Sequence, residues 1–233
     1  MCTAVSARKP SAARSRAAPK LAAAVIQAMQ QLGMAGGRFE VALLAQDEPQ
    51  GFGLETLGLT MAGAFLAIDG GCRTSMREVY AIGDVTGEPM LAHRAMAQGA
   101  MVAAVIAGGR EDWDKRAIPA VCYTDPEIVT VGLLPGAATG AAVATFPFAG
   151  NGRALSLGRD DGFVRIVHDR DSGLVLGVQA VGAGVSELAG EFALALEMAA
   201  TLTDLAETIH AHPTLGETVQ EAALKGLGRA LHL

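Results

Sequence analysis

Two histidines and a glutamate lie close together near the end of the chain, in the run His210-Ala-His-Pro-Thr-Leu-Gly-Glu217. Histidine gains and loses a proton near neutral pH, so it is the side chain most often used for proton transfer. A carboxylate that hydrogen-bonds one ring nitrogen orients the imidazole and stabilises its charged form. The run therefore allows a histidine–glutamate pair for acid–base chemistry.

The same residues allow a structural interpretation. Thr214 and Glu217 have the spacing of a capping box, in which the glutamate side chain bonds back to the N–H of the residue that precedes a helix. We expect that one carboxylate cannot satisfy both geometries at once, so the two interpretations compete. Residue chemistry alone favours the cap, because short motifs often occur by chance.

A second run with chemical potential covers residues 79–93, Val-Tyr-Ala-Ile-Gly-Asp-Val-Thr-Gly-Glu-Pro-Met-Leu-Ala-His. A strand over 79–84 would place Gly83 and Asp84 at the edge of a sheet where α/β proteins bind ligands. Glycine lets the backbone approach a ligand, and Asp84 offers acceptors to sugar-like hydroxyls. The helix that follows would present N–H groups near residues 91–93 to an electronegative oxygen. A Gly-Asp pair alone would indicate a turn, but the whole run favours a binding site.

The three cysteines, Cys2, Cys72 and Cys122, do not form a recognisable reactive set. The sequence contains no CxxC, no CxxxxC and no spacing typical of a zinc site, and we predict no metal. A Gly-rich dinucleotide fingerprint is also absent from the sequence. This cysteine usage predicts a reducing interior compartment, and we expect a cytoplasmic protein.

The two runs occur in an order that resembles the dihydrolipoamide dehydrogenases of the pyridine nucleotide-disulphide oxidoreductase family, over about residues 51–233. Gly-Glu-Pro-Met-Leu-Ala-His-Arg-Ala-Met, from residue 87, is similar to the second flavin-binding motif of that family. The resemblance implies that Gly83 and Asp84 bind FAD, with Asp84 on the ribityl chain. It further implies that the flavin contacts a short segment at the helix start, formed by Met90, Leu91, Ala92 and His93. Backbone N–H groups near Ala92 and His93 would face the pyrimidine edge of the flavin ring.

The resemblance also assigns roles in the C-terminal run. It implies that His212 is the base that takes a proton from a substrate dithiol and that Glu217 is its partner. It implies a cis peptide bond at His212–Pro213 and a histidine that serves the flavin of the opposite subunit. No role follows for His210. Residues 120–132 are similar to the start of the family's dimerisation domain, which implies a core position for Cys122.

Hydrophobic periodicity gives the elements that must position these residues. We expect an α/β part followed by an α+β part with helices on an antiparallel sheet. The expected regions are an unassigned segment with the composition of a disordered tail over 1–50, a remnant of an NAD/FAD-binding region over 51–116, and a C-terminal dimerisation domain over 117–233. The predicted strands cover 39–45, 64–69, 79–84, 121–123, 127–131, 163–168 and 174–181, a turn covers 47–51, and the predicted helices cover 21–32, 91–106, 185–200, 203–209 and 215–231.

Composition narrows the class of protein further. Hydrophobic residues make up 51% of the 233 residues, but the apolar stretches are far shorter than the roughly 20 residues of a membrane-spanning helix. The net charge is −6, and the first 39 residues hold six basic and no acidic side chains. An acidic remainder argues against a nucleic-acid partner. The basic start is typical of a transit peptide or of a disordered tail, and we favour the tail.

The resemblance implies a truncated flavoprotein related to the NAD-dependent oxidation of dihydrolipoamide in a 2-oxo acid dehydrogenase complex. We expect this chain alone to be inactive and to hold FAD weakly, because the dithiol and both Gly-rich fingerprints are missing, including the NAD site. It would form a homodimer or a heterodimer with a full-length homologue. One alternative is a non-catalytic dimerisation module that pairs with such a homologue, and another is a remnant without a folded function.

Overall fold

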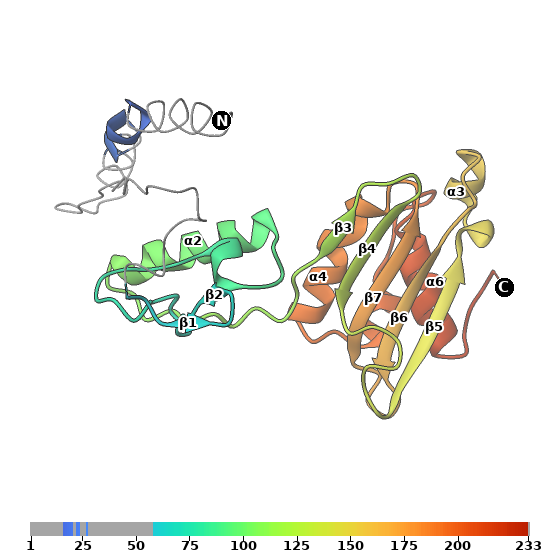
Figure 1. Ribbon diagram of the computed structural model, residues 1–233. Helices are drawn as coiled ribbons and strands as arrows, with labels where there is room; N and C mark the ends of the chain where they lie inside the picture. The colour runs from blue at the N-terminus through green and yellow to red at the C-terminus, as the bar shows by residue number, and fades with distance from the viewer. Residues whose placement is uncertain (1–15, 21, 24–26, 28–57, 233) are drawn as a thin grey trace. The chain divides into compact units, whose positions relative to one another are not determined.

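The computed structural model describes residues 16–20, 22–23, 27 and 58–232 (Figure 1). The expected strand over 39–45, the turn over 47–51 and most of the helix over 21–32 lie outside these residues. The chain divides into two compact units, residues 1–113 and 114–233; the sequence prediction had a boundary between 116 and 117. In the described part of the chain, no helix is long and apolar enough to cross a lipid bilayer.

The first unit is built around one long helix, α2 (Ala92–Ile106), which the sequence predicted to within one residue. Alanine and methionine give this segment high helix propensity. Its buried face carries Met101 and Val102, which pack against Cys72. Two short strands, β1 (Met61–Ala62) and β2 (Phe65–Leu66), form an antiparallel pair in the same unit.

The predicted strand over 79–84 was wrong. Tyr80 makes an isolated bridge to Arg73, and residues Gly83–Thr86 form a 3-10 helix, η2. Gly83 has a φ of +72°, outside the β region, and its N–H donates to the buried Gln98 side chain at 2.8 Å. A side chain of α2 therefore satisfies the N–H that a neighbouring strand would have bonded.

The second unit is a five-stranded antiparallel sheet covered on one face by helices, which confirms the predicted fold class (Figure 1). The strand order is β3-β4-β7-β6-β5, and every neighbouring pair is antiparallel. The strands are β3 (Ala120–Cys122), β4 (Glu127–Gly132), β5 (Ala141–Pro147), β6 (Phe163–Asp169) and β7 (Val175–Gly182).

Alternation along the strands decides which face is buried. On the helix-covered face, Val129, Ile166 and Val178 are fully buried, and Phe192 from the helical layer packs into the same core. The core position expected for Cys122 was wrong, because Cys122 is exposed and its neighbour Val121 packs toward the core.

The helices are shorter than the periodicity predicted. They are η4 (Val185–Leu188), α4 (Ala189–Glu197), α5 (Leu202–Glu207) and α6 (Glu217–Gly226). Ala199 has a positive φ, which ends the helical path after α4. Thr201 and Asp204 then form a reciprocal capping box that starts α5. Local backbone chemistry therefore ends α4 before the predicted residue 200 and starts α5 one residue before the predicted residue 203.

Strand β5 and the short helix α3 (Gly152–Ser156) were not predicted. The β5 sequence, Ala-Ala-Val-Ala-Thr-Phe-Pro, has few β-branched residues and ends in proline, which suits an edge strand. Asn151 caps α3 by accepting the N–H of Ala154 at 2.9 Å. Neither signal stands out in a sequence rich in alanine and glycine.

Gly132 at the end of β4 lies where two backbones and a helix side chain meet. Its φ is +71°, and a Cβ there would overlap the Leu176 carbonyl oxygen and the Leu196 side chain. We expect Gly132→Ala to lower the free energy of unfolding by several kcal/mol, because backbone strain of about 1–2 kcal/mol adds to the overlap. Urea denaturation measures the loss.

Gly136→Ala is the matched control. Gly136 also has a positive φ, of +81°, but no atom lies within 4 Å of the position of its Cβ. The control should lose only the strain contribution, about 1–2 kcal/mol. Equal losses in both variants would contradict the close packing at Gly132.

Candidate functional site

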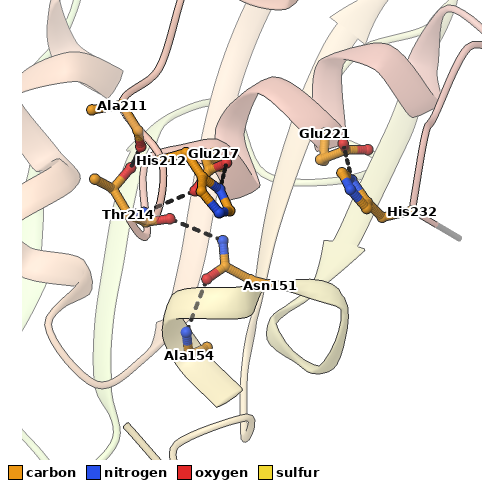
Figure 2. A network of polar contacts seen from close by, with 8 residues as sticks. All are labelled: Asn151, Ala154, Ala211, His212, Thr214, Glu217, Glu221 and His232. Carbon is orange, nitrogen blue, oxygen red and sulfur yellow. Dashed lines mark hydrogen bonds and ion pairs between the residues drawn. The ribbon is translucent and has the colours of Figure 1, made fainter. Parts of the chain in front are cut away.

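His212 and Glu217 meet just before and at the start of α6 (Figure 2). The His212 Nδ1 lies 2.9 Å from the Glu217 Oε1, and the His212 side chain is 78% exposed. An ionised carboxylate only accepts hydrogen bonds, so Nδ1 carries the proton in this contact. In the neutral ring, Nε2 is then unprotonated, which is the form of a general base.

The second oxygen of the same carboxylate has its own partner. Glu217 Oε2 accepts the backbone N–H of Thr214 at 2.8 Å. The expectation that one carboxylate cannot serve both contacts was wrong, because one oxygen of Glu217 binds the His212 ring and the other accepts the backbone N–H of Thr214 (Figure 2).

The expected capping box is only half formed. Helix α6 begins at Glu217 with Gly216 as its N-cap, and that cap has no side-chain hydrogen bond. The Thr214 hydroxyl donates instead to the Ala211 carbonyl at 2.7 Å. Glu217 therefore closes the turn that carries His212, and Thr214 closes the same turn from its other side.

These contacts also set the charge of Glu217. Partial burial of the carboxylate tends to raise its pKa, but the hydrogen bonds from the Thr214 N–H and from His212 outweigh burial and hold the pKa below its ordinary value. The carboxylate is therefore ionised at neutral pH and can stabilise a positive charge on His212.

A residue that the sequence did not single out fixes this turn from another element. Asn151 is buried, and its Nδ2 donates to the Thr214 carbonyl at 3.0 Å while its Oδ1 caps α3 (Figure 2). The two residues are 63 positions apart in sequence, so no local pattern joins them. The cis peptide bond implied at His212–Pro213 is present.

His210, to which the sequence assigned no role, has a carboxylate partner of its own. Its Nε2 lies 2.8 Å from the Glu191 Oε1, and Glu191 stands in the first turn of α4. No local pattern in the sequence signals this pair, because 19 positions separate the two residues.

In the first unit, the predicted binding residues lie in the loop before α2 and at the start of that helix, and Gly83 among them is buried. Asp84 and Met90 are exposed, Leu91 is the N-cap of the helix, and Ala92 and His93 are its first two residues. No described residue bonds the Asp84 carboxylate, and the helix start has no side-chain cap. Acceptors and helix N–H groups of this kind fit a flavin, whose ribityl hydroxyls donate and whose ring oxygens accept.

Arg94 fixes the conformation of this loop, a role that the sequence did not predict. The guanidinium is buried and donates to the Gly87 carbonyl, to the Pro89 carbonyl at 3.2 Å and to the Thr86 hydroxyl at 2.9 Å. Thr86 in turn donates to the Gly83 carbonyl at 2.7 Å. A charged residue in an alanine-rich helix was the signal available in the sequence.

Comparison with known families matches both units. A family model described as the pyridine nucleotide-disulphide oxidoreductase dimerisation domain covers residues 118–223, and one described as pyridine nucleotide-disulphide oxidoreductase covers residues 45–99.

Curated relatives are similar over most of this chain. It is 59% identical over 197 residues to a dihydrolipoyl dehydrogenase of Pseudomonas aeruginosa, an alignment that covers 83% of this chain and 42% of the relative. A dihydrolipoyl dehydrogenase of Halobacterium salinarum is 53% identical over 171 residues, covering 72% and 36%. The chain thus spans about two fifths of the length of the curated relatives it matches.

Solved structures show the same relationship. LpdA from Mycobacterium tuberculosis superposes with a TM-score of 0.68 at 32% identity, covering 75% of this chain and 39% of that one. The flavoprotein disulfide reductase RclA from Escherichia coli reaches a TM-score of 0.66 at 20% identity, covering 79% and 42%, and shares the fold.

The charge of Glu217 leads to a prediction about stability and pH. A carboxylate whose pKa is lower in the folded than in the unfolded chain stabilises the fold at any pH above its unfolded-state pKa. That contribution is lost as the pH falls through the folded-state pKa. We expect Glu217→Gln to cost about 1 kcal/mol at pH 7, and the difference from wild type to shrink below about pH 4.3. Urea denaturation between pH 3 and pH 7 measures both.

The control is Glu207→Gln, which removes an exposed carboxylate from α5. Its stability should follow the wild type across the whole range. A Glu217→Gln deficit that stays constant down to pH 3 would show that the carboxylate charge plays no part.

Proposed function

This chain belongs to the pyridine nucleotide-disulphide oxidoreductase family, and from that premise we propose that it provides the acid–base pair of a dihydrolipoyl dehydrogenase active site. The single observation that carries the proposal is the His212–Glu217 contact of 2.9 Å at Nδ1 on a ring that is otherwise exposed. This arrangement leaves Nε2 facing outward as a base for a substrate proton.

The chemistry assigned to the pair is proton transfer. Oxidation of a dithiol to a disulphide removes two electrons and two protons, and NAD⁺ takes up two electrons with one of those protons. In the proposed step, His212 Nε2 accepts a proton from a substrate thiol, which leaves a thiolate able to attack a disulphide. The ionised Glu217 stabilises the resulting imidazolium, and the exposed ring releases the proton to water.

The loop before α2 is the proposed flavin contact. FAD, when bound, would carry electrons between the thiol chemistry and NAD. Asp84 would accept hydrogen bonds from ribityl hydroxyls, and the start of α2 would face an electronegative oxygen of the ring. The Arg94 contacts support this assignment, because they fix the loop through two backbone carbonyls and the Thr86 hydroxyl and leave the Asp84 side chain exposed.

The proposal needs a second chain. The 233 residues contain no CxxxxC pair and no Gly-rich fingerprint, so dithiol exchange and NAD binding would come from a full-length homologue. The sheet unit would form the contact, as the description of its matching domain suggests. Ile209 is 95% exposed and Met198 72% exposed, and large exposed apolar side chains of this kind favour a protein partner. Such a dimer would work within a 2-oxo acid dehydrogenase complex.

A second candidate function is a dimerisation module without chemistry. The absence of a CxxxxC pair from the sequence favours this candidate, because such a chain could pair with a homologue without donating a reacting group. The two candidates differ in one respect: only the first needs His212 in the paired state.

A hybrid dimer separates the candidates. The full-length Pseudomonas aeruginosa relative would carry glutamine in place of its own matching histidine and be co-purified with this chain through different affinity tags. We expect this chain to restore NAD-dependent oxidation of dihydrolipoamide, and His212→Gln in this chain to lower that activity by about 10²–10⁴-fold. Steady-state NADH formation measures the rate.

His232→Gln is the matched control, because His232 is also an exposed histidine with a carboxylate partner, Glu221, farther along α6 (Figure 2). It should leave the hybrid's activity unchanged. Hybrids that form but have equal activity with and without His212 would support the dimerisation module instead.

Flavin binding is tested on the purified chain itself by titration with FAD and measurement of flavin fluorescence. We expect Asp84→Ala to weaken FAD binding by about tenfold, the effect of losing one hydrogen bond of about 1–1.5 kcal/mol. Glu111→Ala, which removes another exposed carboxylate of the same unit, should bind as the wild type does. Equal affinities of the Asp84 and Glu111 variants would exclude the proposed ribityl contact.

A further inference from the structure

His210 is a second histidine beside the proposed catalytic pair, and it is enclosed where His212 is open. Its side chain is only 8% exposed. The Nε2 lies 2.8 Å from the Glu191 Oε1 on α4, and the Nδ1 lies 2.9 Å from the Thr208 carbonyl oxygen just after α5. Both ring nitrogens are therefore committed to neighbours inside the protein.

Both neighbours are acceptors, and this fixes the protonation state of the ring. A neutral imidazole has one N–H, whereas two acceptors require two, so the geometry holds His210 as an imidazolium. The hydrogen bond that His210 donates to Glu191 raises the pKa of His210, burial opposes this, and the Thr208 carbonyl and the charge of Glu217 raise the pKa further. Glu191 of α4 and Glu217 of α6 are the charged groups that face the ring among the described residues.

The ring also lies beside the start of α6. A Cβ placed on Gly216, the N-cap of α6, would lie 3.2 Å from the His210 Cδ2. The Thr208 carbonyl that bonds His210 also accepts from Gln220 of α6 at 3.1 Å. His210 thus joins α4, the end of α5 and the N-cap of α6, and His212 lies on the turn between these points.

We propose that His210 is a positioning residue, a charged clamp between Glu191 and the Thr208 carbonyl that fixes residues 208–217 and so holds His212 against Glu217. The inference deepens the proposed function and rests on it for its meaning in catalysis. The clamp acts on the backbone of this segment, because the hydrogen bonds of the His210 ring go to Thr208 and Glu191 and not to His212.

A clamp of this kind depends on pH in a defined direction. A histidine whose pKa is raised in the folded chain stabilises the fold fully at any pH below its unfolded-state pKa of about 6.5. That contribution is lost as the pH rises through the folded-state pKa. Loss of the proton removes one of the two donors, so one anchor of residues 208–217 is released above that pH.

Glu191→Gln removes the pH dependence while keeping the shape. The glutamine amide can donate to an unprotonated Nε2 while the Nδ1–H still binds the Thr208 carbonyl, so a neutral His210 keeps both bonds. We expect ¹H–¹⁵N spectra of the labelled wild-type chain to show two protonated ring nitrogens on His210 at pH 7. In Glu191→Gln, the titration midpoint of His210 should fall by about one pH unit or more. Glu187→Gln, an exposed carboxylate of η4, should leave the midpoint unchanged.

A second readout tests positioning. The Thr214 N–H donates to Glu217 in the turn that carries His212, so its hydrogen exchange reports whether that turn is held. After correction for the intrinsic effect of pH, protection of this amide in the wild type and in Glu187→Gln should drop as His210 loses its proton. In Glu191→Gln the drop should be absent.

Two results would overturn the inference. A His210 that is a neutral tautomer at pH 7 in the wild type, or whose midpoint is the same in Glu191→Gln, eliminates the charged clamp. If the hydrogen-exchange protection of the Thr214 amide does not change as His210 titrates, His210 does not position the turn that carries His212. Neither measurement involves flavin or substrate, so a hybrid dimer without activity would refute the proposed function and leave the clamp standing.

Discussion

The burial of one sheet face beneath helices is the constraint on which the rest of the second unit depends. Fully buried valine, isoleucine and phenylalanine side chains join the strands to α4, α5 and α6. Because residues 208–216 connect α5 to α6, the packing of those helices decides where this connection begins and ends. His212 can stand exposed on a short turn and still keep a defined position, because both ends of the turn belong to a packed layer.

Several carboxylates around this core accept hydrogen bonds from backbone N–H groups of irregular segments. Glu217 binds a histidine and a backbone N–H, and Glu127 accepts the N–H of Ser186 at the start of η4. Glu197 at the end of α4 accepts the N–H groups of residues 116 and 117, close to the boundary of the unit. An ionised acceptor makes a stronger hydrogen bond to N–H than a neutral one does, which suits it to hold irregular segments that have no ladder partner.

Regular elements with strong periodicity could be predicted from the sequence, and contacts between distant segments could not. Helix α2 and strands β4, β6 and β7 carry their pattern locally, and the structure places them within one or two residues of the prediction. The strand over 79–84 failed because Gln98, fifteen positions away, takes the N–H of Gly83. The sequence could pair His212 with Glu217 because only five positions separate them. Asn151 and Glu191 act across the fold, so no spacing in the sequence reveals them.

The Arg94 contacts bear on how this loop can change during evolution. The guanidinium donates hydrogen bonds to the main-chain oxygens of Gly87 and Pro89, so these two contacts do not depend on the side chains at those positions. Arg94 therefore specifies part of the loop's shape from the following helix, and the loop supplies the rest, through the Thr86 side chain and the positive φ of Gly83 and Gly87. Lysine carries the same charge but a single donor atom, so it could not reach both carbonyls and the Thr86 hydroxyl from the planar fork that arginine provides. During evolution, this loop can therefore change at positions that neither bind Arg94 through a side chain nor need a positive φ, whereas an exchange of Arg94 would release the main chain at Gly87 and Pro89.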